Sequence, residues 1–241
     1  MATAASSSSK AESLRRFFRD ALRIVFPELC CHCGKILVGD EQDLCTDCLC
    51  QIPWARLAEM PDNAVEQRLS GYHVQAAASL LIFRKGNIGQ TIIHQIKYHG
   101  NLRLAHTYGR LLGNELKQSG RFNDIDGIVP VPLHFLRRIK RGYNQSKQIA
   151  QAVAEVLQCP VLTRNLYRKR YTTTQTHKNR TERHKNMQNV FAVRHPEQLS
   201  GKHILLLDDV ITTGATTTSC FLALSQIPDL RVSIASLAVT Q

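Results

Sequence analysis

Two adjacent carboxylates and a run of small hydroxyl residues share one short segment, and both groups are suited to ligand binding. Asp208 and Asp209 follow four apolar residues. The small residues come shortly after this acidic pair: Thr212, Thr213, Gly214, Ala215 and Thr216. Carboxylates only accept hydrogen bonds, so the pair suits sugar hydroxyls or a hydrated magnesium ion. The threonines add donors and the glycine permits close approach, which together favour a phosphate.

The residues on either side of this segment indicate how it is held. The apolar run 204–207 predicts a short buried strand, and residues 216–225 predict a helix. A loop that opens a helix presents free backbone N–H groups, and the helix dipole favours an anion there. We therefore expect a phosphorylated sugar, with its phosphate in the loop and its diol on the acidic pair. The alternative is an ordinary strand-to-helix turn with a capping threonine.

Segment 204–216 resembles the 5-phosphoribosyl-1-pyrophosphate (PRPP) motif of type I phosphoribosyltransferases. The likeness covers the apolar strand, the Asp-Asp pair and the Thr-Thr-Gly-Ala-Thr loop. It implies that the chain binds PRPP with magnesium. In that arrangement Asp208 and Asp209 hold the ribose hydroxyls of the reacting sugar, and the loop holds its 5′-phosphate.

The rest of the chain alternates between expected strands and expected helices. The expected strands are 74–83, 127–133, 161–162, 204–207 and 232–238. The expected helices are 88–98, 102–116, 145–157 and 216–225. This alternation predicts an α/β fold with a mostly parallel sheet and helices on both faces. Ligands of such sheets bind beyond the carboxyl ends of the strands, where we expect Asp208 and the loop after it.

A second expected strand end carries positive charge. The loop after strand 127–133 contains Arg137, Arg141 and Gly142. A pyrophosphate group needs cations and backbone donors, so we expect this loop, with Lys97, to bind the pyrophosphate of the same ligand. The polar stretch 163–190 has no strong periodicity and is typical of a lid or binding loop.

The chain is strongly basic, with 241 residues and a formal net charge of +12. Many of the basic residues fall in the segments 134–147 and 164–185. Clustered positive charge indicates a polyanionic partner, which is PRPP, pyrophosphate or nucleic acid, and a solvated surface is the alternative. Tyr143, Tyr167 and Tyr171 lie within or beside these segments and are candidates for stacking on bases of single-stranded DNA, with ordinary packing as the alternative. Trp54 and Tyr98 are further candidates.

Six of the eight cysteines fall within residues 30–50. Two Cys-x-x-Cys pairs supply four thiolates for one tetrahedral zinc ion: Cys30, Cys33, Cys45 and Cys48. Cys31, His32 and Cys50 are further potential ligands, so the spacing alone leaves the ligand set open. Disulfides and a redox-active Cys-x-x-Cys are the alternatives. The first is disfavoured by the lack of a secretory signal, and the second by the lack of a flanking strand and helix.

A four-cysteine ribbon followed by a phosphoribosyltransferase-like domain resembles the ComF family of competence-associated proteins. The signature residues are Val-Pro-Val-Pro-Leu at 129–133 and Arg-Gly-Tyr-Asn-Gln at 141–145. Supporting residues are Ile96, Lys97 and Tyr98, and a hood loop with Gln175, Arg180 and Arg183. The resemblance implies PRPP binding and the handling of single-stranded DNA during DNA uptake, with a competence helicase or uptake proteins as partners. The alternative is an active phosphoribosyltransferase that transfers phosphoribosyl to a nitrogen acceptor and releases pyrophosphate.

The sequence predicts three parts. Residues 1–25 form a tail and a short amphipathic helix, residues 26–56 the zinc ribbon, and residues 57–241 the phosphoribosyltransferase-like domain. An Arg-rich amphipathic start also occurs in transit peptides, but Glu12 and Asp20 argue against one here. The chain has no signal-peptide pattern and no apolar run of about 18 residues, so we expect a cytoplasmic protein without a membrane span.

Overall fold

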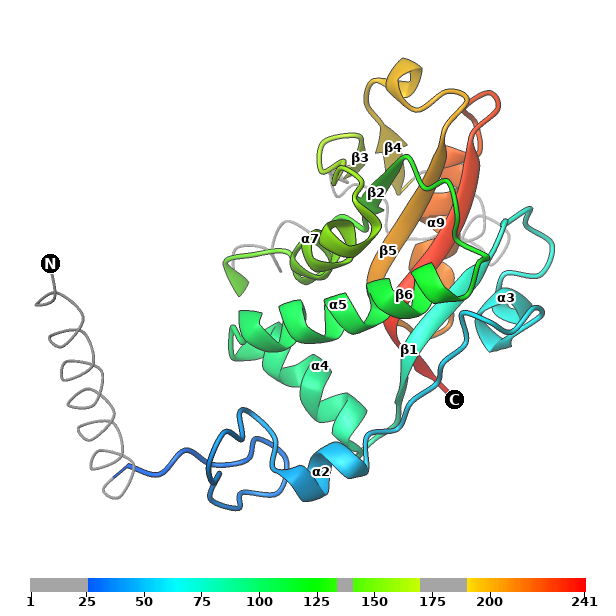
Figure 1. The fold of residues 1–241 in the computed structure, drawn as a ribbon. Coiled ribbons are helices and arrows are strands. Elements are labelled where there is room, and N and C mark those ends of the chain that lie inside the picture. Colours follow the sequence, from blue (N-terminus) through cyan, green and yellow to red (C-terminus); the bar gives the residue numbers. More distant parts are fainter. Residues whose placement is uncertain (1–25, 134–140, 170–189) are drawn as a thin grey trace, which may run out of the picture. The chain divides into compact units, whose positions relative to one another are not determined.

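The computed structural model describes residues 26–133, 141–169 and 190–241 (Figure 1). The chain divides into two compact units, the first ending at Ile52 and the second beginning at Pro53. The described elements are α2 (Thr46–Cys50), α3 (Ala64–Arg68), β1 (Ala77–Phe83), α4 (Ile88–Tyr98), α5 (Leu102–Gln118), β2 (Gly127–Pro130), α7 (Gln145–Leu157), β3 (Leu166–Arg168), β4 (Phe191–Val193), the 3-10 turn η1 (Pro196–Gln198), β5 (His203–Ile211), α9 (Ala215–Leu224) and β6 (Arg231–Thr240).

A parallel sheet forms the centre of the second unit. Four strands of the described chain lie in the order β1-β6-β5-β2, and every neighbouring pair is parallel. The two central strands, β5 and β6, are buried along nearly their whole length. Their near-continuous apolar sequences suit this position, because a parallel strand is covered on both faces. The predicted α/β class with a mostly parallel sheet is therefore confirmed.

Helices cover both faces of this sheet. In Figure 1, α5 and α7 lie on the near side of the strands and α9 lies behind them. Ile204 and Leu206 of β5 belong to the same buried cluster as Phe221 of α9. Leu205 and Leu207 point to the opposite face, because side chains alternate along a strand, and they are equally buried.

Most predicted elements are present, and the exceptions have physical reasons. The helix predicted over 88–98 has the observed bounds of α4, and α7 matches its predicted range as well. The strand predicted over 204–207 is longer than expected: β5 runs through the acidic pair to Ile211 because residues 208–211 pair in register with β6. The predicted strand 161–162 is reduced to an isolated bridge between Val161 and Ile128. The short antiparallel pair β3–β4 was not predicted, since its strands have only three residues each.

The described residues of the first unit, 26–52, contain few buried aliphatic side chains, which are Leu37, Leu44 and Ile52. Leu29 and Ile36 form an antiparallel bridge that brings the two sides of a turn together. The Glu41 carboxylate accepts hydrogen bonds from the backbone N–H groups of Val38 and Thr46, at 3.0 and 2.7 Å. Backbone and side-chain hydrogen bonds, more than apolar burial, therefore order this unit.

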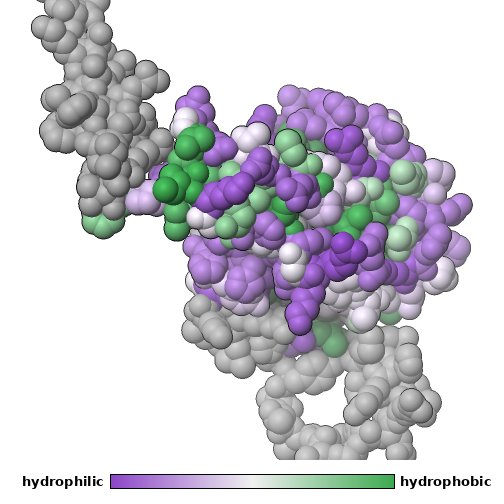
Figure 2. All heavy atoms as spheres, turned by 90° about the horizontal axis from the view of Figure 1, so that it is seen from below, coloured by the Kyte–Doolittle hydropathy of each residue, from purple (hydrophilic) through white to green (hydrophobic). Residues whose placement is uncertain are grey.

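None of the helices in the described ranges is long and apolar enough to cross a membrane. The face of the molecule seen in Figure 2 is mostly hydrophilic, and hydrophobic residues form small patches between the polar ones.

Candidate functional site

A cavity of about 430 Å³ lies at the carboxyl ends of the strands. Its walls come from the end of β1, one face of α4, the residues after β2, the start of α7, and the end of β5 with the loop that follows. The polar and aromatic residues that line it, apart from Phe83, are Gln90, His94, Lys97, Tyr98, Arg141, Ser146, Arg168, Asp208, Asp209, Thr212 and Thr216. This edge is where parallel sheets bind their ligands, because the loops that follow the strands converge there.

The acidic pair occupies the last part of β5 and is almost fully buried, with 9% of Asp208 and 8% of Asp209 exposed. Asp208 Oδ1 accepts hydrogen bonds from the Asp209 backbone N–H at 2.8 Å and from the Ser146 hydroxyl at 3.2 Å. Burial raises the pKa of Asp208 to about 7, and the neighbouring Asp209 carboxylate adds to this effect. Asp209 forms an ion pair with Lys97, with 2.8 Å between Oδ1 and Nζ.

Helix α4 presents a continuous face to the cavity. Its lining residues follow the helical spacing i, i+3, i+4, i+7 and i+8: Gln90, Ile93, His94, Lys97 and Tyr98. Asn87 caps the helix, because its Oδ1 accepts from the Gln90 N–H at 2.8 Å. The Asn87 amide also donates to the Ile82 carbonyl at 2.9 Å, which ties the helix start to the end of β1.

The start of α7 is fixed in a similar way on the other side of the cavity. Asn144 accepts from the Ser146 N–H through Oδ1 and donates to the Val131 carbonyl through Nδ2, both at 3.1 Å. This pair of bonds joins the helix start to the end of β2. It places Ser146 against Asp208, and it brings the preceding segment, with Arg141, to the cavity wall.

Arg141 is held by neutral partners. Its guanidinium donates to Gln145 Oε1 at 3.2 Å and to the Tyr98 hydroxyl at 3.1 Å, and it lies 4.8 Å from the centre of the Tyr98 ring. Since these partners carry no negative charge, the positive charge of Arg141 can act on an anion in the cavity. The adjacent Gly142 has a φ of 77°, in the region that favours glycine.

The hydroxyl-rich loop joins β5 to α9. Gly214 is the N-cap of α9 with a φ of 79°, a conformation that glycine adopts without strain. No side chain caps this helix, although the Thr213 hydroxyl accepts from the Ala215 N–H at 3.4 Å. Thr212 and Thr216 line the cavity, whereas Thr213, Gly214 and Ala215 connect them without lining it. A helix start of this kind can bind a phosphate.

Arg68 was not singled out from the sequence, yet it supports this loop. It donates to the backbone carbonyls of Thr212, at 2.7 Å, and of Thr240. A second bond reaches the Thr240 hydroxyl at 3.2 Å. Arg68 thus joins the start of the loop to the end of β6. An isolated arginine in a short helix gives no signal for such a role.

Four polar residues of the cavity wall were also not singled out as site residues: Gln90, His94, Ser146 and Arg168. Arg168 lies in the basic segment 164–185, which the sequence analysis noted. His94 lies one helical turn before Lys97, so the helical spacing could have indicated that it faces the same site. Arg137 of the predicted pyrophosphate loop lies outside the described residues, as do Gln175, Arg180 and Arg183 of the predicted hood loop.

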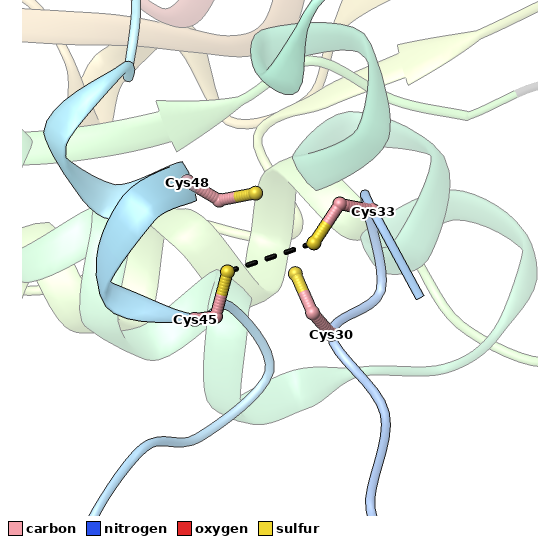
Figure 3. Close-up of side chains that lie close together, drawn as sticks. All are labelled: Cys30, Cys33, Cys45 and Cys48. Atoms are coloured by element: carbon pink, nitrogen blue, oxygen red, sulfur yellow. Dashed lines mark hydrogen bonds between the residues drawn. The ribbon is translucent and has the colours of Figure 1, made fainter. Parts of the chain in front are cut away.

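The second candidate site is the cysteine cluster of the first unit. The sulfurs of Cys30, Cys33, Cys45 and Cys48 all lie within 4.8 Å of one another, with 3.6 Å between those of Cys33 and Cys45. Figure 3 shows the four side chains pointing towards a common centre. A zinc ion with four bonds of about 2.3 Å to sulfur needs sulfurs roughly 3.8 Å apart, so the donor set and its spacing suit such a metal.

Local structure explains why these four residues meet. Gly34, with a φ of 74°, closes the turn after the first Cys-x-x-Cys pair, and Cys45 is the N-cap of α2. Burial acts to raise the pKa of the Cys30 thiol, but backbone hydrogen bonds outweigh it and lower the pKa to about 6. The pKa values of Cys45 and Cys48 are raised instead, and for Cys48 burial is the main cause, so coordination is supported by the donor set and its spacing rather than by these shifts. The group of four does not include Cys31, His32 or Cys50, which the sequence left open.

The chain is similar to curated bacterial proteins over most of its length. It is 31% identical to the DNA utilization protein YhgH of Salmonella typhi over 192 residues, or 78% of this chain and 74% of that protein. Competence protein F of Haemophilus influenzae is 28% identical over 192 residues, again 78% of this chain and 74% of the relative. Competence protein ComFC of Streptococcus pneumoniae is 28% identical over 195 residues, covering 75% and 80% of the two chains.

Solved structures give weaker likenesses. The allosteric regulatory enzyme of purine biosynthesis aligns with a TM-score of 0.42 and 16% identity, covering 60% of this chain and 30% of that one. Adenine phosphoribosyltransferase from Leishmania tarentolae aligns with a TM-score of 0.40 and 10% identity, covering 70% and 93%. No protein-family model matches the chain. On the strength of the curated relatives and the four-cysteine cluster, the chain belongs to the ComF family of competence-associated proteins.

Proposed function

We propose that the chain binds PRPP, as its magnesium complex, in the cavity at the end of the sheet. The observation that carries this proposal is that a single cavity combines three kinds of group. These are two carboxylates, a hydroxyl-rich helix start, and three cations from other segments, Lys97, Arg141 and Arg168. A phosphorylated sugar with a pyrophosphate group needs all three, because its diol, phosphate and pyrophosphate are recognised by different chemistry.

Each group has a part in this proposal. Asp208 and Asp209 accept hydrogen bonds from the ribose hydroxyls, and Thr212 to Thr216 bind the 5′-phosphate through hydroxyls and backbone N–H groups. Lys97 and Arg141 neutralise the pyrophosphate, together with the magnesium ion that PRPP carries. Lys97 is paired with Asp209, which holds its charge at the cavity wall.

Binding of PRPP is tested by titration calorimetry with magnesium present. We expect the double variant Asp208→Asn, Asp209→Asn to lose measurable PRPP binding while its circular dichroism spectrum stays that of the wild type. Asp229→Asn, at an exposed position away from the cavity, is the matched control and keeps the wild-type affinity. An affinity unchanged by the double substitution would sink the assignment of this site.

We propose further that the chain handles single-stranded DNA during DNA uptake. The support is twofold: relatives carry names that refer to DNA utilization and competence, and the chain has a net charge of +12. Contacts to phosphates release counterions, so such binding weakens as salt rises. The partners that we expect are uptake proteins such as a competence helicase.

Zinc is the metal that we propose for the four-cysteine cluster. It would be held by Cys30, Cys33, Cys45 and Cys48 and would supply cross-links to a unit with a small core. Tetrahedral thiolate sets of this kind select zinc over magnesium or calcium, which prefer oxygen ligands.

Phosphoribosyl transfer is the second candidate function. It is favoured by the presence, in one cavity, of carboxylates for the sugar and of cations for a departing pyrophosphate. The test is release of pyrophosphate from PRPP in the presence of nucleobases and amines. Acceptor-dependent release would establish transfer, whereas binding without release would leave PRPP as a bound regulator.

A further inference from the structure

A group of planar side chains lies at the open wall of the cavity. The rings of His94 and Tyr98 are 4.5 Å apart, those of His94 and His99 are 5.7 Å apart, and Arg141 lies over the Tyr98 ring at 4.8 Å. We refer to these four residues as the aromatic platform. His94, Tyr98 and Arg141 also line the cavity, so the platform adjoins the proposed PRPP site.

The rings are tilted by 44° and 48° to one another rather than stacked, and they are exposed, whereas rings that only fill a core are buried. The Tyr98 residue is 55% exposed, and His94 and His99 are exposed as well. The preceding buried residues of α4, Ile92 and Ile96, already secure the helix against the sheet. Packing of the helix therefore does not account for the rings on its other side.

The platform's chemistry matches an unpaired nucleobase. Aromatic rings and guanidinium groups stack on bases of any sequence, and a cationic surround draws in the phosphates that bases carry. Arg141 lies over the Tyr98 ring, and Arg168 lines the same cavity, whereas Lys97 is paired with Asp209.

We propose that the aromatic platform of His94, Tyr98, His99 and Arg141 is a nucleobase-stacking site at the edge of the cavity. The proposal deepens the proposed function, on which it rests, by naming the class of ring that binds next to PRPP. The base comes from one of two sources: a single DNA strand, or a free nucleobase that enters as an acceptor.

The test uses pairs of probes that differ only in their bases. Binding of an oligothymidylate is compared with binding of an abasic oligonucleotide of the same length, and free adenine, guanine, uracil and cytosine are titrated separately. The variants are Tyr98→Leu, which removes the ring, and Tyr98→Phe, which keeps it. His94→Ala tests the second ring, and Tyr72→Leu is a control at an exposed tyrosine outside the cavity.

We expect the wild type to bind at least one base-containing probe, and Tyr98→Leu to weaken that binding roughly five-fold or more, as the loss of one stacked base predicts. Tyr98→Phe and Tyr72→Leu should keep it. Stronger binding of oligothymidylate than of the abasic strand identifies a DNA base. Binding of a free base, with equal affinity for the two strands, identifies an acceptor.

Two results would overturn the platform. One is a wild type that neither separates the two strands nor binds a free base. The other is a preference for bases that survives both Tyr98→Leu and His94→Ala. PRPP calorimetry on the same preparations distinguishes failure of the platform from failure of the proposed function. A protein that binds PRPP but no base refutes only the platform.

Discussion

Asp208 combines a buried position with a nearby second carboxylate, and both features disfavour its ionised form. Its pKa rises from an ordinary value of 3.8 to about 7 in the folded protein. Between these two pH values the unfolded chain has lost the proton while the folded protein keeps it. The folded state then binds more protons, so stability falls as pH rises from about 4 to 7. Asp208 thus lowers the stability of the folded protein at neutral pH, while it places a buried hydrogen-bond acceptor in the cavity.

Asp208→Asn removes this titration. We expect the free energy of unfolding of the variant, measured by urea denaturation, to fall less than that of the wild type between about pH 4 and 7. At pH 4 the two proteins should be close in stability, because Asp208 is neutral in the folded wild type there. Asp229→Asn serves as an exposed control and should keep the wild-type slope. Parallel curves for wild type and Asp208→Asn would contradict the buried, proton-binding state.

Arg68 acts at the residue scale on the backbone of the proposed phosphate loop. Its guanidinium bonds to the carbonyls of Thr212 and Thr240, so Arg68→Met leaves both without this donor. We expect a loss of about 1–3 kcal/mol in unfolding free energy, as for hydrogen bonds to charged groups. The unfolding free energy of Arg68→Lys should lie between those of the wild type and Arg68→Met, because an ammonium group cannot donate to both carbonyls as the guanidinium does. Lys202→Met, which removes an exposed cation, is the control; equal losses in Arg68→Met and Lys202→Met would refute the role.

Among the elements, those with strong periodicity were predictable and those fixed by pairing were not. The helix α4 has caps and apolar spacing in its own sequence, and its predicted bounds match. The end of β5 depends on the register with β6, in which Val210 pairs with Ala238, and no local pattern reveals this. The PRPP-like motif is local in sequence, so its residues that line the cavity, Asp208, Asp209, Thr212 and Thr216, could be picked out without the fold. Ser146 and Arg68 were missed because only the tertiary fold brings them there.

The contact between α5 and α7 depends on two glycines of α5, Gly109 and Gly113. A Cβ at Gly109 would lie 2.7 Å from the Ala152 Cβ and 3.0 Å from the Ile149 carbonyl oxygen. Gly109→Ala should therefore destabilise the protein by about 1–3 kcal/mol through overpacking, despite the better helix propensity of alanine. Calorimetric unfolding measures this loss.

The matched test of this contact is the double variant Gly109→Ala, Ala152→Gly, which moves the methyl group from one helix to the other. Because the double variant relieves the closest approach, we expect its loss of unfolding free energy to be smaller than the sum of the losses in the two single variants. If the losses of unfolding free energy simply add, the two helices can move apart, and their close approach does not limit the size of residue 109.

At the scale of the whole molecule, the two units draw their stability from different sources. The unit from Pro53 onward has a large core on both faces of its sheet. The described part of the first unit has three buried aliphatic residues, Leu37, Leu44 and Ile52, and four cysteines whose sulfurs converge. A core of that size gives little apolar stabilisation, so the zinc ion proposed above would add to the hydrogen bonds that order this unit.

Removal of the metal should therefore unfold one unit and spare the other. We expect a strong chelator to increase amide hydrogen exchange across residues 30–50, because thiolate–metal bonds replace the missing core. Exchange in β1 and β6 should stay slow, because the sheet is ordered by its own burial. Cys30→Ser should reproduce the effect and lower the zinc content found by elemental analysis. Cys159→Ser, outside the cluster, should change neither. Exchange over residues 30–50 that is unaffected by the chelator, in protein shown to be metal-free, would mean that the hydrogen bonds of Glu41 and the backbone suffice to hold this unit.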